Sequence, residues 1–203
     1  MQNICVNLID LDIAKAHIVG LSMGGYTAVQ VGINHPDRAL SLTIAGAGSG
    51  SERWYTEEFR RNSLEVAKKF EAEGAAVVAK AYGAGPGRVP FEVKDPRGYA
   101  EFVRLLSEHD AQGSAHTMRG FQGERPSIYD FEDGIGRIAL PALIVVGDED
   151  DPCIEPSLFL KKHIAASGLC VFPKTGHVVN LEEPALFNGH TLSERVLITW
   201  RDV

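Results

Sequence analysis

The sequence has few cysteines, no long hydrophobic run and no surplus of positive charge, and each absence excludes a class of protein. Its 203 residues include three widely spaced cysteines, Cys5, Cys153 and Cys170, with no Cys-x-x-Cys pair. This pattern argues against a disulfide framework and is typical of reduced thiols in a cytoplasmic protein, with Cys153 expected to be a small buried side chain. No apolar stretch approaches the roughly 18 residues that a membrane-spanning helix needs.

The amino terminus and the charge balance exclude two further classes. The first residues, Met-Gln-Asn-Ile-Cys-Val, lack the basic start and long apolar core of a secretory signal. The formal net charge is −7, and no lysine- or arginine-rich cluster offsets it. This balance argues against a nucleic-acid partner. We therefore expect a cytoplasmic protein with neither a membrane nor a nucleic acid as its partner.

The sequence also lacks the common cofactor and metal motifs. The glycine cluster Gly46–Gly50 does not have the Gly-x-Gly-x-x-Gly spacing, and Gly-Lys-Ser/Thr does not occur. No set of histidine, cysteine, aspartate and glutamate shows the spacing of a metal site. We therefore expect no cofactor and no metal.

What the sequence does contain is a serine between two glycines, Gly20-Leu-Ser22-Met-Gly24, at the end of a short apolar run. A strand, a sharp turn that exposes a serine, and a helix form the context of a nucleophile elbow. Glycines two residues to either side of Ser22 have no Cβ atom to obstruct such a turn. Ser22 is thus a candidate nucleophile, and the Met23 backbone N–H at the start of the helix is a candidate oxyanion donor. The alternative is a tight turn with an ordinary surface serine.

Hydrophobic patterning predicts an alternation of strands and helices. Strands are expected over residues 17–21, 40–45, 142–146 and 169–172, and helices over 4–14, 24–33 and 156–164 and from Pro184 onward, where Asn188-Gly189 interrupts the last one. Strand–helix–strand units of this length imply parallel strands. The polar block 51–137 has helical periodicity, with one helix expected over 114–122, and it indicates a helical cap inserted into a core made of residues 1–50 and 138–203.

Partners for the serine occur downstream in the order acid, then histidine. One predicted strand ends in Gly147-Asp-Glu-Asp150-Asp, and the next predicted strand is followed by Gly176-His177. The carboxyl ends of parallel strands line one crevice, so Ser22, an acid and His177 are expected to meet there. Asp148 and Asp151 compete with Asp150 as the acid. His109 and His116, within the predicted cap, could face a substrate.

Three motifs together resemble the α/β-hydrolase fold proteins of the cap-bearing esterase and carbon–carbon hydrolase type. They are Gly-Leu-Ser-Met-Gly-Gly, Pro141-Ala-Leu-Ile-Val-Val-Gly-Asp-Glu-Asp150 and Gly176-His-Val-Val-Asn-Leu-Glu-Glu-Pro184. The resemblance implies Ser22 as the nucleophile, His177 as the general base and Asp150 as the residue that orients it. It also implies an α/β fold with a parallel-sheet core and an inserted helical cap.

The chain departs from this pattern before the elbow. The family's core opens with further strands and a histidine–glycine loop that supplies a second oxyanion donor, and neither precedes Ser22 here. We therefore expect an amino-terminally incomplete core, explained by truncation, by association through the bare edge of the elbow strand, with a homo-oligomer as one form, or by a naturally reduced protein. Losing one oxyanion donor typically costs about 10²–10³ in rate.

The expected function is a serine-dependent hydrolase that acts on a small ester or a related carbonyl substrate. Carbon–carbon hydrolysis and perhydrolysis are close alternatives in chemistry. A different class is a catalytically impaired remnant that serves as an interaction module.

Overall fold

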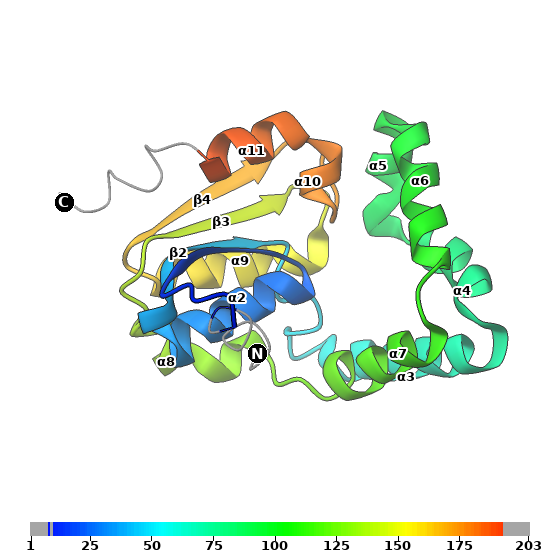
Figure 1. The fold of residues 1–203 in the computed structure, drawn as a ribbon, viewed down its shortest axis with the longest axis horizontal. Coiled ribbons are helices and arrows are strands. Elements are labelled where there is room, and N and C mark those ends of the chain that lie inside the picture. Colours follow the sequence, from blue (N-terminus) through cyan, green and yellow to red (C-terminus); the bar gives the residue numbers. More distant parts are fainter. Residues whose placement is uncertain (1–7, 9, 193–203) are drawn as a thin grey trace.

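The computed structural model describes residue 8 and residues 10–192, and its four strands form one parallel sheet (Figure 1). The strands, in spatial order, are β1 (Ala16–Leu21), β2 (Ala39–Ala45), β3 (Ala142–Gly147) and β4 (Ser167–Phe172). Each neighbouring pair runs in the same direction. The predicted α/β class and its four-strand parallel core are confirmed.

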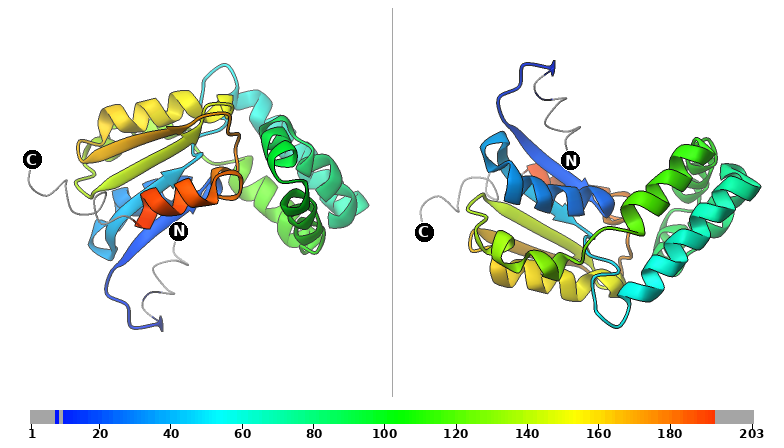
Figure 2. Two further views of the ribbon diagram at one scale, coloured as in Figure 1. Left: turned by 90° about the horizontal axis from the view of Figure 1, so that it is seen from above. Right: turned by 90° about the horizontal axis from the view of Figure 1, so that it is seen from below.

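Helices cover both faces of the sheet, which explains the continuous apolar runs of its inner strands (Figure 2). All six residues of β3 are buried, and alternate side chains face opposite sides. Ile144 packs in one cluster with α2, α8 and α9, whereas Leu143 and Val145 pack in another with α10 and α11. These helices are α2 (Met23–Asn34), α8 (Glu132–Gly136), α9 (Asp151–His163), α10 (Val179–Glu182) and α11 (Pro184–Leu192), and a short η1 (Pro36–Arg38) joins α2 to β2.

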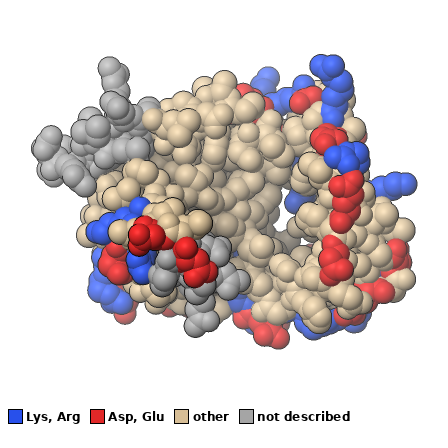
Figure 3. Space-filling view, in the orientation of Figure 1, with Lys and Arg blue, Asp and Glu red and all other residues tan. Residues whose placement is uncertain are grey.

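A second group of helices lies beside the carboxyl ends of the strands, and we call it the helical block (Figure 1). It contains α3 (Thr56–Glu73), α4 (Ala75–Gly83), η2 (Pro86–Arg88), α5 (Val89–Lys94), α6 (Pro96–Ser107), α7 (Ala111–His116) and the π-helix η3 (Thr117–Gln122). The block has a small core of its own around Phe70 and Val78. In the space-filling view a hollow separates it from the sheet layers, and charged side chains gather on its outer surface (Figure 3).

The extent of the predicted cap, residues 51–137, remains a prediction. Within that range, η4 (Ile128–Phe131) and α8 contribute Ile128 and Ile135 to the main core beside the sheet. None of the described helices is both long and apolar enough to cross a membrane.

Several helix boundaries differ from the predicted ones. Helix α9 begins at Asp151, five residues before the predicted start at Pro156, and α11 continues through Asn188-Gly189 to Leu192. The single helix predicted over 114–122 is an α-helix followed by a π-helix. The helix predicted over 4–14 lies mostly outside the described residues.

Candidate active site

Ser22 lies on a strained turn between β1 and α2. Its backbone has φ 57° and ψ −113°, a conformation that non-glycine residues rarely adopt. The Ser22 N–H donates to the Ala45 carbonyl at 2.8 Å, which fixes the turn to the neighbouring strand. A Cβ atom on Gly20 would lie 2.1 Å from the Gly24 carbonyl oxygen, so the turn requires glycine at position 20.

Gly24, two residues after the serine, does not have the steric role that the sequence predicts. A Cβ atom on Gly24 would meet nothing within 4 Å, whereas one on Gly25 would lie 2.7 Å from the Ala45 oxygen. The expectation that Gly24 relieves a steric clash is therefore wrong. Close packing of α2 against β2 requires glycine at position 25 instead.

The structure brings Ser22, His177 and Asp150 together in one chain of hydrogen bonds. His177 Nδ1 lies 2.9 Å from Asp150 Oδ2, and His177 Nε2 lies 2.9 Å from Ser22 Oγ. A carboxylate only accepts hydrogen bonds, so Nδ1 carries the proton and Nε2 accepts from the serine hydroxyl. Asp150 is 3% exposed. This arrangement can take a proton from Ser22 and hold the resulting imidazolium beside a buried carboxylate.

The competing acids have other surroundings. Asp148 accepts a hydrogen bond from the Thr175 N–H at 3.1 Å, which joins the acidic turn to the loop that carries His177. Asp151 is exposed at the first turn of α9. Of the three aspartates, Asp150 is the one hydrogen-bonded to the imidazole.

Two cavities meet at Ser22. The first, of about 410 Å³, extends into the helical block and is lined by apolar side chains that include Phe70, Leu106 and Met118. The second, of about 380 Å³, is more polar and is lined by His177, Arg88 and Arg125. A reacting carbonyl at Ser22 could therefore place an apolar part and a polar part of its molecule in separate spaces.

Sequence comparison assigns the family of this fold and site. A sequence model described as the alpha/beta hydrolase family matches residues 2–189. The chain belongs to the alpha/beta hydrolase family. The resemblance seen in its three motifs is thereby confirmed.

The chain is similar to several curated proteins and to solved structures of this fold. It is 28% identical over 192 residues to 3-oxoadipate enol-lactonase 1 of Acinetobacter baylyi, covering 92% of this chain and 68% of the relative. It is 26% identical over 187 residues to the 2-hydroxy-6-oxononadienedioate/2-hydroxy-6-oxononatrienedioate hydrolase of Escherichia coli, covering 90% of this chain and 63% of the relative. The fold superposes on MenH from S. aureus with a TM-score of 0.86 and 18% identity, covering 99% of this chain and 74% of that one. The chain thus spans about two thirds of the length of these curated relatives.

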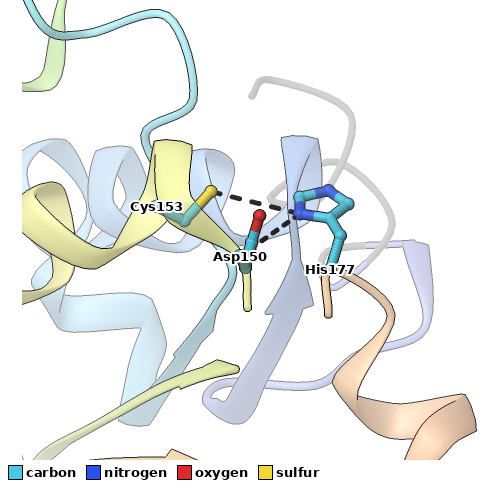
Figure 4. Close-up of side chains that lie close together, drawn as sticks. All are labelled: Asp150, Cys153 and His177. Carbon is cyan, nitrogen blue, oxygen red and sulfur yellow. Dashed lines mark hydrogen bonds and ion pairs between the residues drawn. The ribbon is translucent and has the colours of Figure 1, made fainter. Parts of the chain in front are cut away.

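Cys153 lies beside the histidine–aspartate pair, and its Sγ is 4.0 Å from His177 Nδ1 (Figure 4). Ligand atoms of Asp150, Cys153 and His177 lie within 4.8 Å of one another, as a metal site would require. However, burial, and then the neighbouring Asp150, raise the pKa of the Cys153 thiol well above its usual value, so the sulfur keeps its proton. Its Sγ lies 3.3 Å from the Gly46 carbonyl oxygen. The group fits a hydrogen-bonded pair backed by a neutral thiol better than a metal site, whose thiol must ionise. Cys153 is fully buried, as the sequence predicts.

The remaining candidates occupy different places around the serine. Met23 is the first residue of α2, where its N–H has no partner within the helix, and it lines the apolar cavity. Both histidines are exposed; His109 lines the same cavity, whereas His116 lines neither of the two cavities at Ser22.

Sequence reasoning missed three polar residues of the site. Arg88 and Arg125 line the polar cavity, and Gln122 lines both cavities with its Oε1 buried and unpartnered among the described residues. All three lie in the region predicted as a helical cap, where no motif marks them. An isolated arginine before proline, as at Arg125-Pro126, was the only available signal, and it is a weak one.

Proposed function

We propose that this chain is a serine-dependent hydrolase that acts on a small ester, a lactone or a related carbonyl compound. The observation that carries the proposal is the hydrogen-bonded series Ser22–His177–Asp150, which opens onto two cavities. Ser22 is the nucleophile, His177 the general base and Asp150 the group that orients the imidazole.

Hydrolysis proceeds through an acyl-enzyme. Ser22 Oγ attacks the substrate carbonyl carbon while its proton passes to His177 Nε2, and Asp150 holds the imidazolium through Nδ1. His177 then gives the proton to the leaving oxygen, and the bond between that oxygen and the carbonyl carbon breaks. A water molecule, deprotonated by His177, attacks the acyl carbon and releases the acid and the serine hydroxyl. No proton or electron is gained or lost over the cycle.

The Met23 backbone N–H serves as an oxyanion donor. It belongs to the first residue of α2, where the helix dipole favours negative charge. With this donor alone the rate is expected to lie about 10²–10³ below that of a site with two donors.

The relatives favour this reaction class without fixing the substrate. One is named as an enol-lactonase and another as a hydrolase of a 6-oxo dienedioate. Lactone and ester hydrolysis use the mechanism above directly. Hydrolytic carbon–carbon cleavage uses the same residues with a carbon leaving group and is the nearest alternative, followed by perhydrolysis, in which hydrogen peroxide replaces water.

The edge strand favours a second candidate function, an interaction module. Among the described residues β1 pairs with β2 alone, and Val19 on β1 is 49% exposed. A strand from another chain can pair along such an edge. A second copy of this chain could supply that strand.

Hydrolysis of 4-nitrophenyl acetate by wild type and three variants tests the proposed reaction. Ser22→Ala is expected to lower kcat/KM by at least about 10³, since it removes the nucleophile. Asp150→Asn is expected to lower it by roughly 10³–10⁴, because the amide favours the wrong imidazole tautomer. Asp151→Asn is the matched control on the same turn and should stay within about twofold of wild type, because its charge is exposed. Equal rates for wild type and Ser22→Ala would contradict the proposal.

A further inference from the structure

Arg125 is a cation in the active-site cavity, and it forms no ion pair with a carboxylate of the described residues. Its Nη2 donates to the Ser49 carbonyl at 2.7 Å. The guanidinium carbon lies 5.1 Å from the ring centres of both Tyr26 and Phe59. Burial lowers the pKa of Arg125 from its usual value, which reflects the cost of keeping this charge away from water.

Arg88 enters the same cavity from the helical block. Its Nη1 donates to the Tyr82 carbonyl at 3.3 Å, and its buried Nε has no partner among the described residues. The guanidinium carbon lies 4.5 Å from the centre of the Tyr82 ring. The preceding residue, Gly87, accepts a hydrogen bond from the His177 N–H at 2.7 Å, so Arg88 is fixed beside the loop of the general base.

Aromatic rings do not use the hydrogen-bonding capacity of these two arginines. A ring stacked on a guanidinium contacts its face and leaves the N–H groups at its edge available for a planar anion. A carboxylate or phosphate is the ligand that matches this edge, and such a partner stabilises a partly buried cation.

The acids of the polar cavity do not neutralise the arginines. Glu149 and Asp151 line the cavity but are exposed to solvent. Asp150 is already hydrogen-bonded to His177. Solvent screens the charges of the exposed Glu149 and Asp151. Arg88 and Arg125 both line this cavity, as Ser22 does, so a ligand that fills it from Ser22 meets both guanidinium groups.

We propose that Arg125 and Arg88 bind a carboxylate of the substrate, so that the compound hydrolysed at Ser22 is an ester or lactone that carries a free carboxylate. This inference rests on the proposed function. The carboxylate occupies the polar cavity, and the uncharged part occupies the apolar cavity formed with Phe70 and Met118. The two arginines act as specificity-determining residues and take no part in proton transfer.

Matched ester pairs measure this specificity on both sides of the ester bond. In the first pair, mono-4-nitrophenyl succinate carries a carboxylate on the acyl side, and 4-nitrophenyl pentanoate is its neutral counterpart. In the second pair, 4-acetoxybenzoate carries a carboxylate on the leaving group, and 4-methylphenyl acetate is its neutral counterpart. For each pair the readout is the ratio of kcat/KM for the anionic ester to that for the neutral ester. In at least one pair, Arg125→Met is expected to lower the ratio about tenfold or more, and Arg88→Met by a similar or smaller factor.

Two further variants separate charge from structure. Arg125→Lys keeps the positive charge and should retain part of the preference that Arg125→Met loses. Arg60→Met removes an arginine whose ion pair with Glu57 lies on the exposed surface of α3, and it should leave both ratios unchanged. Ratios that stay within twofold of wild type in both Arg125→Met and Arg88→Met would overturn the proposal.

Binding of succinate, measured by calorimetry with the wild-type chain and each variant, gives a readout independent of turnover. Weaker binding by about tenfold in Arg125→Met or Arg88→Met supports the carboxylate site, and equal binding, or no binding to wild type together with unchanged ratios, overturns it. If Ser22→Ala hydrolyses the neutral esters as fast as wild type, the proposed reaction fails, while succinate binding still decides the carboxylate site. If Arg125→Met does not fold, the Arg88→Met ratios and binding decide the question.

Discussion

At the scale of single residues, the position of Ser22 depends on Gly20, which has no Cβ atom. The serine holds a positive φ angle, and the chain doubles back so closely that position 20 has no room for a Cβ atom. Position 24, which has the same residue type in the same motif, is open. The two glycines therefore differ in how far each tolerates substitution.

We expect Gly20→Ala to destabilise the chain severely and Gly24→Ala to leave it close to wild type. A Cβ atom at position 20 would lie 2.1 Å from the Gly24 oxygen, so the turn must open, at a cost of about 3 kcal/mol or more. Alanine at position 24 falls inside α2 without a clash and raises helix propensity. Urea unfolding of both variants tests this difference. An equal loss in the two variants would contradict it.

Glu52 is a buried carboxyl group that the proposed reaction does not use. It is 5% exposed, and its Oε2 has no partner among the described residues. Burial raises the pKa of Glu52 above its usual value of 4.5, and the nearby Glu155 and Asp150 raise it further. The folded chain therefore binds this proton more tightly than the unfolded chain does.

The consequence is a stability contribution that depends on pH. It is fully present below pH 4.5 and is lost as the pH rises through the raised pKa of the folded state. Glu52→Gln stays neutral, so its free energy of unfolding should exceed that of wild type by about 1–3 kcal/mol in mildly alkaline buffer, with little difference below pH 4.5. Urea unfolding across this range is the measurement. Glu58→Gln, at an exposed position of α3, should show no such trend.

Single residues also show where sequence reasoning succeeds and where it stops. Ser22 and His177 were predictable because each follows a strand end that hydrophobic patterning locates. Asp150 was separable from its neighbours only by the family spacing, and the structure explains the difference, because Asp148 bonds the Thr175 N–H. Arg125 could not be predicted, because its role depends on rings more than 60 positions away in the chain, such as Phe59.

At the scale of elements, the loop that carries His177 is held by the helical block. Lys94, the last residue of α5, donates to Thr175 Oγ1 at 3.1 Å and to Glu183 at 2.7 Å. It also lies 3.7 Å from the fully buried side chain of Glu182. Glu182 in turn accepts hydrogen bonds from the Gly176 N–H, next to His177. A contact between two elements thus supports the position of His177, the proposed general base.

Lys94→Met should loosen this contact. We expect a loss of about 1–3 kcal/mol in the free energy of unfolding, because a buried carboxylate loses its nearest cation, together with a lower kcat for ester hydrolysis. Lys68→Met is the matched control, since Lys68 pairs with Glu65 on the exposed face of α3 and should change stability by less than about 0.5 kcal/mol. Thermal unfolding and kinetics measure both variants. The same effect in both would argue against a specific role for Lys94.

Elements were predictable where their apolar period was unambiguous and less so at their ends. The inner strands stand out because both of their faces are buried. Helix α9 was predicted to begin at Pro156, yet Pro152 already occupies the first turn, where proline is favoured, and the buried Pro156 packs against the loop at Gly48. Tertiary packing thus outweighs the local signal, as it also does at Asn188-Gly189 within α11.

At the scale of the whole molecule, the sheet presents β1 as an edge among the described residues. The turn that carries Ser22 follows β1, so pairing along this edge would take place next to the candidate active site. An exposed apolar edge strand favours association with another strand, and a lysine on such a strand opposes it.

We expect the 203-residue chain to self-associate in a concentration-dependent way, and Val19→Lys to reduce this association. Val19 is 49% exposed on β1, and Val171 is 51% exposed on β4, at the opposite edge of the sheet. Val171→Lys is therefore a control with matched residue type, exposure and edge position. Light scattering coupled to size-exclusion chromatography, over a range of loading concentrations, measures the mass of each form. A monomer at every concentration, or equal dissociation by both substitutions, would show that the edge of β1 does not drive assembly. The proposed interaction module would then be contradicted, whereas the proposed hydrolase function would not be affected.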